Sequence, residues 1–586
     1  MSRPDDPRYR HISVVATHAL RRFAVVLGFT LAACAYPAHH RATAQPYDLI
    51  LRNGTVYDGS GSPAVKGDIA IVGGRIIAVG QLPDAVGREE LDLDSLAVAP
   101  GFINMLSWAT ESLIEDGRAL SDVKQGVTLE VFGEGWSMGP LNDAMKQAPF
   151  RIMPDIKFDI AWSTLGQYLD FLEKRGVSVN VASFIGAATV RIHELGYVNR
   201  APTADELARM QALVRQAMEE GALGVGSSLI YAPAHYAKTD ELKALVAAAA
   251  PYGGGYISHI RSEGDQFLEA LDELIDISRT TGAHAEAYHL KAAGRDNWNK
   301  MAQAINRIES ARRQGLPISA DMYPYTAGAT GLNACMDPAV QEGGTEAWIA
   351  RLKQPEVRKA VVAAMFKKPK TWENICYNSG SPENIVLIGF KQESLKPYTG
   401  KSLAEVAKLR GTSPAEAILD LVIEDGTRVG TAFSMMSEKN VKLGLSQPWV
   451  SLGSDAEAAA PEGVFLKSNP HPRAYGTFAR FLGKYVRDQN VTTLSDAIRR
   501  LTSLPAENFK LRGRGRLEPG FAADIVVFDP AQVRDHSTFA QPHQPAAGVK
   551  HVWVNGVQVL RDGEHTGAKP GSVVRGPGWT GALPGN

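Results

Sequence analysis

Along its central part, the chain alternates short apolar runs with stretches whose apolar residues recur at helical spacing. One helical stretch, residues 203–220, begins with a capping box of Thr203 and Glu206 and stops at Gly221. The apolar runs have the length and composition of buried strands and are bounded by turn residues. Eight strands are predicted in this way: residues 101–106, 128–132, 177–184, 223–227, 255–258, 284–289, 317–322 and 449–453.

Eight strands that alternate with helices predict an α/β fold, a (β/α)₈ TIM-like barrel over residues 99–505. A doubly wound parallel sheet is the alternative that the same periodicity allows. The interval from Tyr325 to Gln447 is too long for one crossover helix. It therefore predicts a lobe inserted into the barrel around residues 330–447.

The two ends of the predicted barrel are flanked by β-rich sequence. Residues 45–98 and 506–586 contain short β-branched runs separated by turn signals such as Asn53-Gly54 and Asn555-Gly556. The ends of a domain commonly lie close together in space. The two segments therefore predict one small β-sandwich built from both ends of the chain, followed by a C-terminal tail.

Residues 1–44 have the pattern of an export segment. Arg21-Arg22 precede an apolar run, residues 23–33, and no run long enough to span a membrane occurs elsewhere. The run ends at Cys34 in a pattern that resembles the bacterial lipobox, whereas Ala42-Thr43-Ala44 offers a rival cleavage site. The prediction is a periplasmic protein or a lipoprotein anchored through Cys34; a buried helix after a misassigned start is the alternative.

Composition narrows the function classes. The 586 residues carry a formal net charge of −1, with 44% hydrophobic and 21% charged residues, which excludes a mostly disordered, collagenous or coiled-coil chain. A pI near 6.9 gives no basic footprint for nucleic acid. The three cysteines neither form a zinc-finger spacing nor suffice for a disulfide scaffold.

Barrel enzymes carry their chemistry at the carboxyl ends of the strands. Glu134 follows the second predicted strand, His259 and His289 end the fifth and sixth, and Asp455 follows the eighth. Two histidines and one carboxylate form a catalytic zinc set with an open position for water. Each residue alone also has a structural interpretation: a hydrogen-bonded histidine, a turn glutamate, or a helix N-cap at Asp455.

Several motifs at these strand ends occur together. In this light, the chain resembles the amidohydrolase superfamily, and within it the D-aminoacylase (N-acyl-D-amino-acid deacylase) family, from about residue 47 to 575. The resemblance is carried by APGFI at 99–103, GVT at 126–128, EGALG at 220–224, LIYAP at 229–233, SHIRSEG at 258–264, HLKAAG at 289–294, DMYPYTAG at 321–328, GSD at 453–455, HPR at 471–473 and PGFAAD at 519–524.

The resemblance implies a metal site at Glu134, His259 and His289. Glu134 stands where this family usually has cysteine, and Leu106 and Trp108 stand where it has the His-x-His of a second metal position. Neither leucine nor tryptophan ligates zinc, so we expect one Zn²⁺ per chain. Further departures are Ala187, near an expected histidine, and Ala329, where a substrate-binding serine is common.

The family also implies roles for four further residues. Asp455 is expected to take a proton from water and to pass it to the leaving amine. Tyr323 is expected to steady the oxyanion, Arg473 to clamp the substrate carboxylate, and Lys291 to place charge beside the carbonyl or the carboxylate. An apolar corner at Leu106 and Trp108 is expected to reshape the acyl pocket.

The predicted function is the metal-dependent hydrolysis of an N-acyl amino acid, a small-molecule substrate, to a carboxylate and a free amino acid. The D configuration follows from the resemblance alone. Two alternatives stay open: an amidase for cyclic amides or dipeptide-like substrates, and a non-catalytic pseudoenzyme that has lost the His-x-His. No residue pattern specifies the oligomeric state.

Overall fold

The protein is described by a computed structural model that covers residues 46–147 and 152–581. The predicted export segment, with Cys34 and the rival site Ala42-Thr43-Ala44, lies outside the described residues. Within the described ranges, no helix combines the length and the apolar content of a membrane span.

Parallel strands form the predicted barrel, so the alternative of a doubly wound open sheet is wrong. The ring closes where the amide of Met105 donates to Leu452 over 3.2 Å, and where that of Leu223 donates to Ser183 over 2.9 Å. In ring order the strands are β6 (Phe102–Asn104), β7 (Val127–Phe132), β8 (Asn180–Ser183) continued by β9 (Ile185–Gly186), β10 (Gly224–Ser228), β11 (Gly255–His259), β12 (Ala285–Ala287), β13 (Ile318–Met322) and β17 (Val450–Leu452).

Amphipathic helices cover the outside of this ring. The predicted helix at 203–220 is α6 (Ala204–Glu219); its capping box of Thr203 and Glu206 is formed, and Met210 and Val214 face the core. The other α-helices outside the inserted lobe, in the described residues, are α1 (Ser112–Glu115), α2 (Leu120–Val123), α3 (Asp143–Gln147), α4 (Leu165–Arg175), α5 (Ala187–Leu195), α7 (Thr239–Ala249), α8 (Phe267–Thr281), α9 (Lys300–Arg313), α15 (Glu438–Leu445), α16 (Arg473–Arg480), α17 (Leu494–Leu501) and α18 (Ser503–Asn508).

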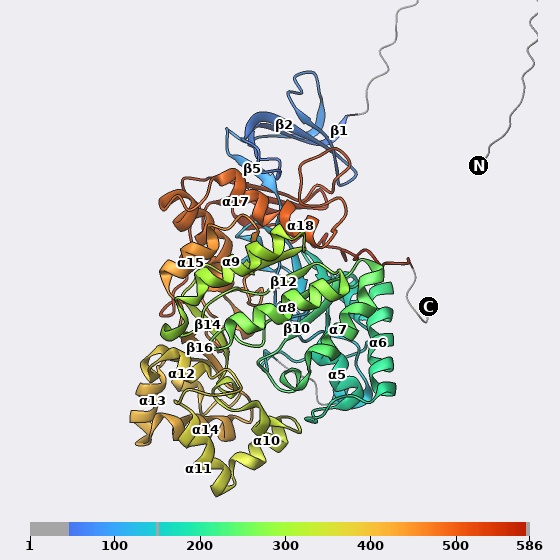
Figure 1. The fold of residues 1–586 in the computed structure, drawn as a ribbon. Coiled ribbons are helices and arrows are strands. Elements are labelled where there is room, and N and C mark those ends of the chain that lie inside the picture. Colours follow the sequence, from blue (N-terminus) through green and yellow to red (C-terminus); the bar gives the residue numbers. More distant parts are fainter. Residues whose placement is uncertain (1–45, 148–151, 582–586) are drawn as a thin grey trace, which may run out of the picture. The chain divides into compact units, whose positions relative to one another are not determined.

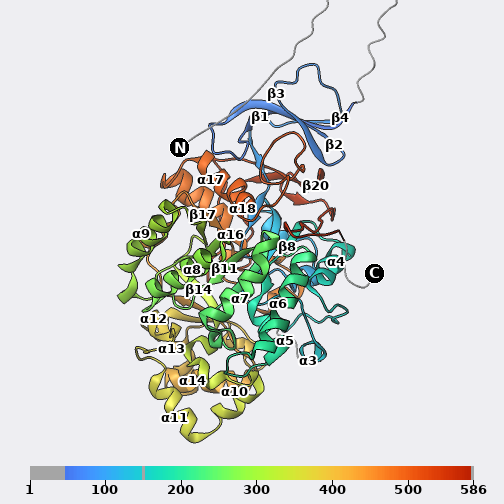
Figure 2. The same ribbon diagram turned by 45° about the vertical axis from the view of Figure 1, so that its right-hand side comes forward.

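Strands from both ends of the described chain form one nine-stranded sheet. β5 pairs with β18 in antiparallel register, with Ala97 opposite Phe528 and Pro100 opposite Ile525. Figures 1 and 2 show these blue and red strands side by side, at the amino end of the barrel strands. The members are β1 (Tyr47–Val56), β2 (Val65–Val72), β3 (Arg75–Gly80), β4 (Gly87–Asp92), β5 (Ala97–Pro100), β18 (Ile525–Phe528), β19 (Val549–Val554), β20 (Val557–Arg561) and β21 (Glu564–His565).

A lobe with its own apolar core is inserted after β13, coloured yellow in Figure 1. Cys335 and Cys376 form a disulfide within it. Its elements are β14 (Ala327–Gly331), β15 (Ile385–Gly389), β16 (Gly430–Ser434), α10 (Gly344–Leu352), α11 (Pro355–Ala364), α12 (Ile375–Ser379), α13 (Leu403–Arg410) and α14 (Pro414–Asp425). Because it follows the carboxyl end of β13, the lobe lies on the side of the barrel where the site residues gather.

Candidate metal centre

Three strand ends bring Glu134, His259 and His289 together; we call these residues the Glu–His–His group. Glu134 follows β7 and lies between two glycines with left-handed backbone, Gly133 (φ 111°) and Gly135 (φ 71°). A Cβ on Gly133 would lie 2.5 Å from the carbonyl oxygen of Phe184, so only glycine permits this turn. The turn directs the glutamate side chain into the mouth of the barrel.

The ligand atoms of the Glu–His–His group converge on one point. Oε1 of Glu134 lies 2.9 Å from Nδ1 of His259 and 3.1 Å from Nε2 of His289. All three ligand atoms lie within 4.8 Å of one another, and each residue is at most 4% exposed. The other ring nitrogen of His259 is buried without a hydrogen-bond partner among the described residues. Two imidazoles and a carboxylate in this arrangement fit a divalent cation such as zinc.

The charges in the group favour a cation at that point. Burial alone would raise the pKa of Glu134, but hydrogen bonds to His259 and His289 hold it well below its usual range. Burial and Lys291 oppose a proton on His289, yet Glu263 and Glu134 raise the pKa of His289 to about 10. A bound metal ion takes the place of that proton, so metal affinity increases with pH.

A buried ion pair behind His289 fixes the orientation of its ring. Oε1 of Glu263 lies 2.9 Å from Nδ1 of His289 and 2.5 Å from the ammonium of Lys291. Glu263 therefore leaves Nε2 of His289 directed at the metal position. In the structure, the ammonium of Lys291 pairs with the carboxylate of Glu263. A substrate contact with Lys291 would come in addition to this ion pair.

Asp455 lies beside the Glu–His–His group and has a partner on each oxygen. Its Oδ1 accepts the indole N–H of Trp108 over 3.1 Å, and its Oδ2 lies 2.7 Å from Nη1 of Arg473 and 4.0 Å from Nε2 of His289. Burial, together with the charge of Glu134, raises the pKa of Asp455 against the opposing effect of Arg473. The arrangement holds a carboxylate within reach of a water at the metal position.

Two site residues have left-handed backbone although neither is glycine. His289 has φ 34° and Asp455 has φ 52°. Such conformations cost about 1–3 kcal/mol each and occur where the surrounding structure holds them. The amide of His289 donates to Oδ1 of Asp321, and the amide of Asp455 donates to the carbonyl of Leu106.

One wall of the site carries positive charge. We call it the cationic wall, and it consists of Arg473, Tyr323 and Lys291. The guanidinium of Arg473 lies 4.6 Å from the ring centre of Tyr323, and the ammonium of Lys291 lies 5.6 Å from it. Arg473 is 3% exposed, and its Nε has no hydrogen-bond partner within residues 46–147 and 152–581. Burial raises the pKa of Tyr323 well above its usual value, so its phenol stays a neutral donor.

The structure thus brings together all seven residues that the sequence indicates; their individual roles stay predictions. Sequence reasoning gave no role to Glu263 or Arg428, and it treated Trp108 only as part of an apolar corner. Trp108 donates its indole N–H to both Glu134 and Asp455. The sequence alone does not predict these hydrogen bonds, because tryptophan is mostly apolar. Glu263 lies four residues after His259, in the SHIRSEG segment. This short spacing is the sequence feature that could have placed Glu263 near the site. Arg428 comes from the inserted lobe, and its charge acts on Tyr231, Glu134 and Asp455.

Comparisons with known proteins identify the family of this chain. The model of the amidohydrolase family matches residues 89–560. The D-aminoacylase of Alcaligenes xylosoxydans xylosoxydans is 33% identical over 91% of this chain and 99% of its own length. The N-acyl-D-aspartate deacylase of the same organism is 32% identical over 90% of this chain and 95% of its own.

Solved structures give the same result. The N-acyl-D-glutamate deacylase of Bordetella bronchiseptica, complexed with zinc and a phosphonate inhibitor, superposes with a TM-score of 0.76 at 28% identity, covering 91% of this chain and all of that one. A crystal structure of a D-aminoacylase superposes with a TM-score of 0.75 at 31% identity, covering 90% of this chain and all of that one. The chain therefore belongs to the amidohydrolase family, in its D-aminoacylase branch.

Proposed function

We propose that the protein is a zinc-dependent hydrolase with one metal ion per chain, which cleaves N-acyl-D-amino acids to a carboxylate and a free D-amino acid. The observation that carries the proposal is the convergence of the Glu–His–His group next to Asp455. The relatives named as D-aminoacylase and N-acyl-D-aspartate deacylase support the substrate class.

Glu134, His259 and His289 would hold the zinc ion. When bound, zinc supplies Lewis-acid activation of the scissile carbonyl and of the attacking water. The chain's own contribution is to keep the three ligand atoms converged, through the Gly133 turn and the contact between Glu263 and His289.

Asp455 is the proton carrier in this proposal. Trp108 and Arg473 fix its two oxygens, so the carboxylate cannot rotate away from the position of the water. It takes a proton when water attacks the amide carbonyl, and it gives that proton to the amine nitrogen when the carbon–nitrogen bond breaks. Both transfers then occur at one fixed carboxylate.

The cationic wall binds the other end of the substrate. The buried Nε of Arg473 can donate to the carboxylate of an N-acyl amino acid, and the neutral phenol of Tyr323 can donate to the developing oxyanion. Lys291 keeps this side of the site positive while it holds Glu263 against His289.

One metal ion is proposed because the position beside the first strand is filled. Leu106 is 1% exposed, and Trp108 donates to both carboxylates that face that position. A structural study of a D-aminoacylase that is 31% identical describes one-metal activation and second-metal attenuation in that enzyme. A chain that lacks the second metal position can therefore be active with a metal ion in the first position.

The protein is further proposed to be exported, and lipidated at Cys34. The disulfide of Cys335 and Cys376 supports this proposal, because such bonds persist mainly in oxidising compartments. Cell fractionation and mass spectrometry of the mature N-terminus test it: a lipid mass that disappears in Cys34→Ser is expected, and an intact cytoplasmic N-terminus would refute it.

The activity is tested with metal-stripped protein that is reloaded with known amounts of zinc. We expect hydrolysis of N-acetyl-D-amino acids to rise with zinc and to saturate at one equivalent per chain, with the L enantiomers cleaved far more slowly. Protein that binds one zinc ion and cleaves neither enantiomer would refute the proposed reaction.

A further inference from the structure

An apolar pocket is lined in part by two neighbours of the Glu–His–His group, Trp108 and Gly133. It encloses about 680 Å³ when the space open to solvent is counted. Trp108 and Gly133 belong to its lining, so its inner end touches the two residues that adjoin Glu134 in space and in sequence. The remaining apolar wall includes Trp136, Met138, Leu141, Met145, Ile160 and Tyr197.

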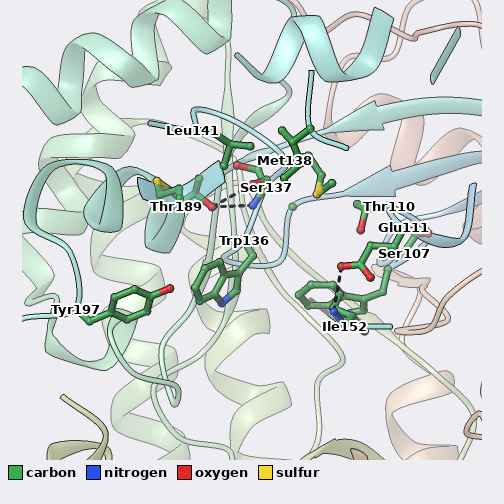
Figure 3. Close-up of a pocket in the computed structure, with 14 residues that line it drawn as sticks. Ser107, Thr110, Glu111, Trp136, Ser137, Met138, Leu141, Ile152, Thr189 and Tyr197 are labelled. Atoms are coloured by element: carbon green, nitrogen blue, oxygen red, sulfur yellow. Dashed lines mark hydrogen bonds between the residues drawn. The ribbon is translucent and has the colours of Figure 1, made fainter. Parts of the chain in front are cut away.

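Several polar groups of this wall are already bonded within the protein. Figure 3 shows Ser137 and Thr189 joined to each other; the amide of Ser137 donates to the Thr189 hydroxyl over 2.8 Å. The carboxylate of Glu111 accepts the amides of Ile152 and Met153 over 3.0 and 2.9 Å. A ligand that enters the pocket therefore meets mostly carbon surface, which disfavours a charged ligand group.

The direction of the pocket decides which part of the substrate it receives. Gly133 and Trp136 follow β7, whereas Lys291 follows β12, and these two strands stand opposite each other in the ring of eight. Lys291, one residue of the cationic wall, and the apolar pocket thus lie on opposite sides of the barrel mouth. In an N-acyl amino acid, the carboxylate and the acyl chain also leave the scissile amide in opposite directions.

We propose that this pocket binds the acyl group of the substrate, and that the protein prefers medium-length aliphatic or aryl-acyl chains to acetyl. The proposal rests on the proposed function for the identity of the scissile bond. Trp108 contacts both parts of the site. Its N–H donates to Glu134 and Asp455, and the residue also lines the pocket. In Figure 3 the phenol of Tyr197 points toward the ring of Trp136 in the same pocket.

The first experiment varies the acyl chain from acetyl to octanoyl on one D-amino acid, and then varies the amino acid side chain on one acetyl group. We expect kcat/KM to rise about twofold per added methylene, below the roughly fourfold that complete removal from water would give. The variant Leu141→Trp narrows the pocket and should abolish this rise. Leu409→Trp, at a side chain 64% exposed on α13, is the matched control.

A rise that is absent in the wild type, or a Leu141→Trp effect confined to the side-chain series, would overturn the proposal. A binding measurement separates this failure from failure of the proposed function. Octanoate and acetate are titrated calorimetrically into zinc-loaded protein, where the metal contributes equally to both. We expect octanoate to bind at least tenfold more tightly, and Leu141→Trp to remove the difference; equal affinities would refute the pocket assignment even in a protein that cleaves no amide.

Discussion

The indole Nε1 of Trp108 donates to Oε2 of Glu134 over 2.9 Å, and the same N–H reaches Asp455 over 3.1 Å. A neutral donor thus lies between two buried carboxylates that would otherwise repel each other. The family resemblance implies a histidine metal ligand at this position, so we expect the tryptophan to stand where a second metal ion would otherwise bind.

Trp108→Phe keeps an aromatic ring but removes this donor. Leaving both buried acceptors short of one bond costs about 1–3 kcal/mol, so we expect kcat to fall about 10- to 100-fold, with KM changed much less. Steady-state kinetics at equal zinc content measures this effect, and Trp579→Phe, at a partly exposed ring, is the control. An unchanged kcat would show that the N–H does not position Asp455.

Introducing two histidines should create a second metal position. We expect the double variant Leu106→His/Trp108→His to bind two zinc ions per chain, because two imidazoles would then face Glu134 and Asp455. Elemental analysis after dialysis against zinc gives the stoichiometry. Leu106→His alone should stay at one ion, and a folded double variant with one ion would contradict the filled-corner explanation.

Asp455→Asn tests the proton carrier. Asparagine keeps the shape of the side chain but cannot accept the proton, so we expect kcat to fall about 10³-fold while zinc is retained. The control Asp170→Asn removes the partner of Arg575, on the outside of the barrel. Loss of zinc together with activity would assign Asp455 to metal binding instead.

Glu263→Gln tests the ion pair behind His289. We expect zinc affinity to fall about 10- to 100-fold, as competition with a chelator would measure. The single variant also leaves the ammonium of Lys291 buried without its carboxylate, which destabilises the fold. Glu263→Gln/Lys291→Met should recover the melting temperature but not the affinity; recovery of both would mean that Glu263 acts only through stability.

Glu373 predicts a pH dependence of stability. Burial, and then the charge of Glu263, raises the pKa of Glu373 from 4.5 to about 8. The folded protein therefore holds a proton that the unfolded chain releases near pH 4.5. The free energy of unfolding falls as the pH rises between these two values, and above about pH 8 the stabilising contribution of Glu373 is lost. Glu373→Gln should lack this loss.

Urea unfolding at pH 5.5 and pH 9 measures the difference. Relative to the wild type, we expect the free energy of unfolding of Glu373→Gln to increase by ~1–3 kcal/mol between the two pH values. Glutamine remains compatible with the site because the amide of Asn378, its neighbour, can present either a donor or an acceptor. Glu356→Gln, at an exposed position on α11, should show no such increase.

The strand pattern predicts the barrel because each buried strand is a separate apolar run with its own terminating polar residue. His259 and His289 could be placed at one mouth for this reason, without any knowledge of their distance. The predicted strand at 177–184 is longer than β8, since Val177 accepts the amide of Gly571 from the C-terminal tail and not a barrel neighbour. A contact between residues so far apart in sequence, such as that of Val177 with Gly571, leaves no pattern in the residues around either of them.

The rest of the site depends on contacts that the sequence does not encode locally. Trp108 looks apolar in sequence, and only its position between two carboxylates makes its N–H important. Arg428 reaches the site from a lobe whose three-stranded sheet pairs β14 with β16, far along the chain. The disulfide of Cys335 and Cys376 likewise joins residues 41 apart in sequence.

The pairing of Ala97 with Phe528 has a consequence for biosynthesis. During vectorial synthesis, β5 emerges long before β18, so the amino-terminal strands remain an incomplete sheet with an exposed edge until almost the whole polypeptide has been made. Ribosome-bound or truncated chains that end before residue 525 therefore lack the partner that closes this edge, and they present it to chaperones or to one another.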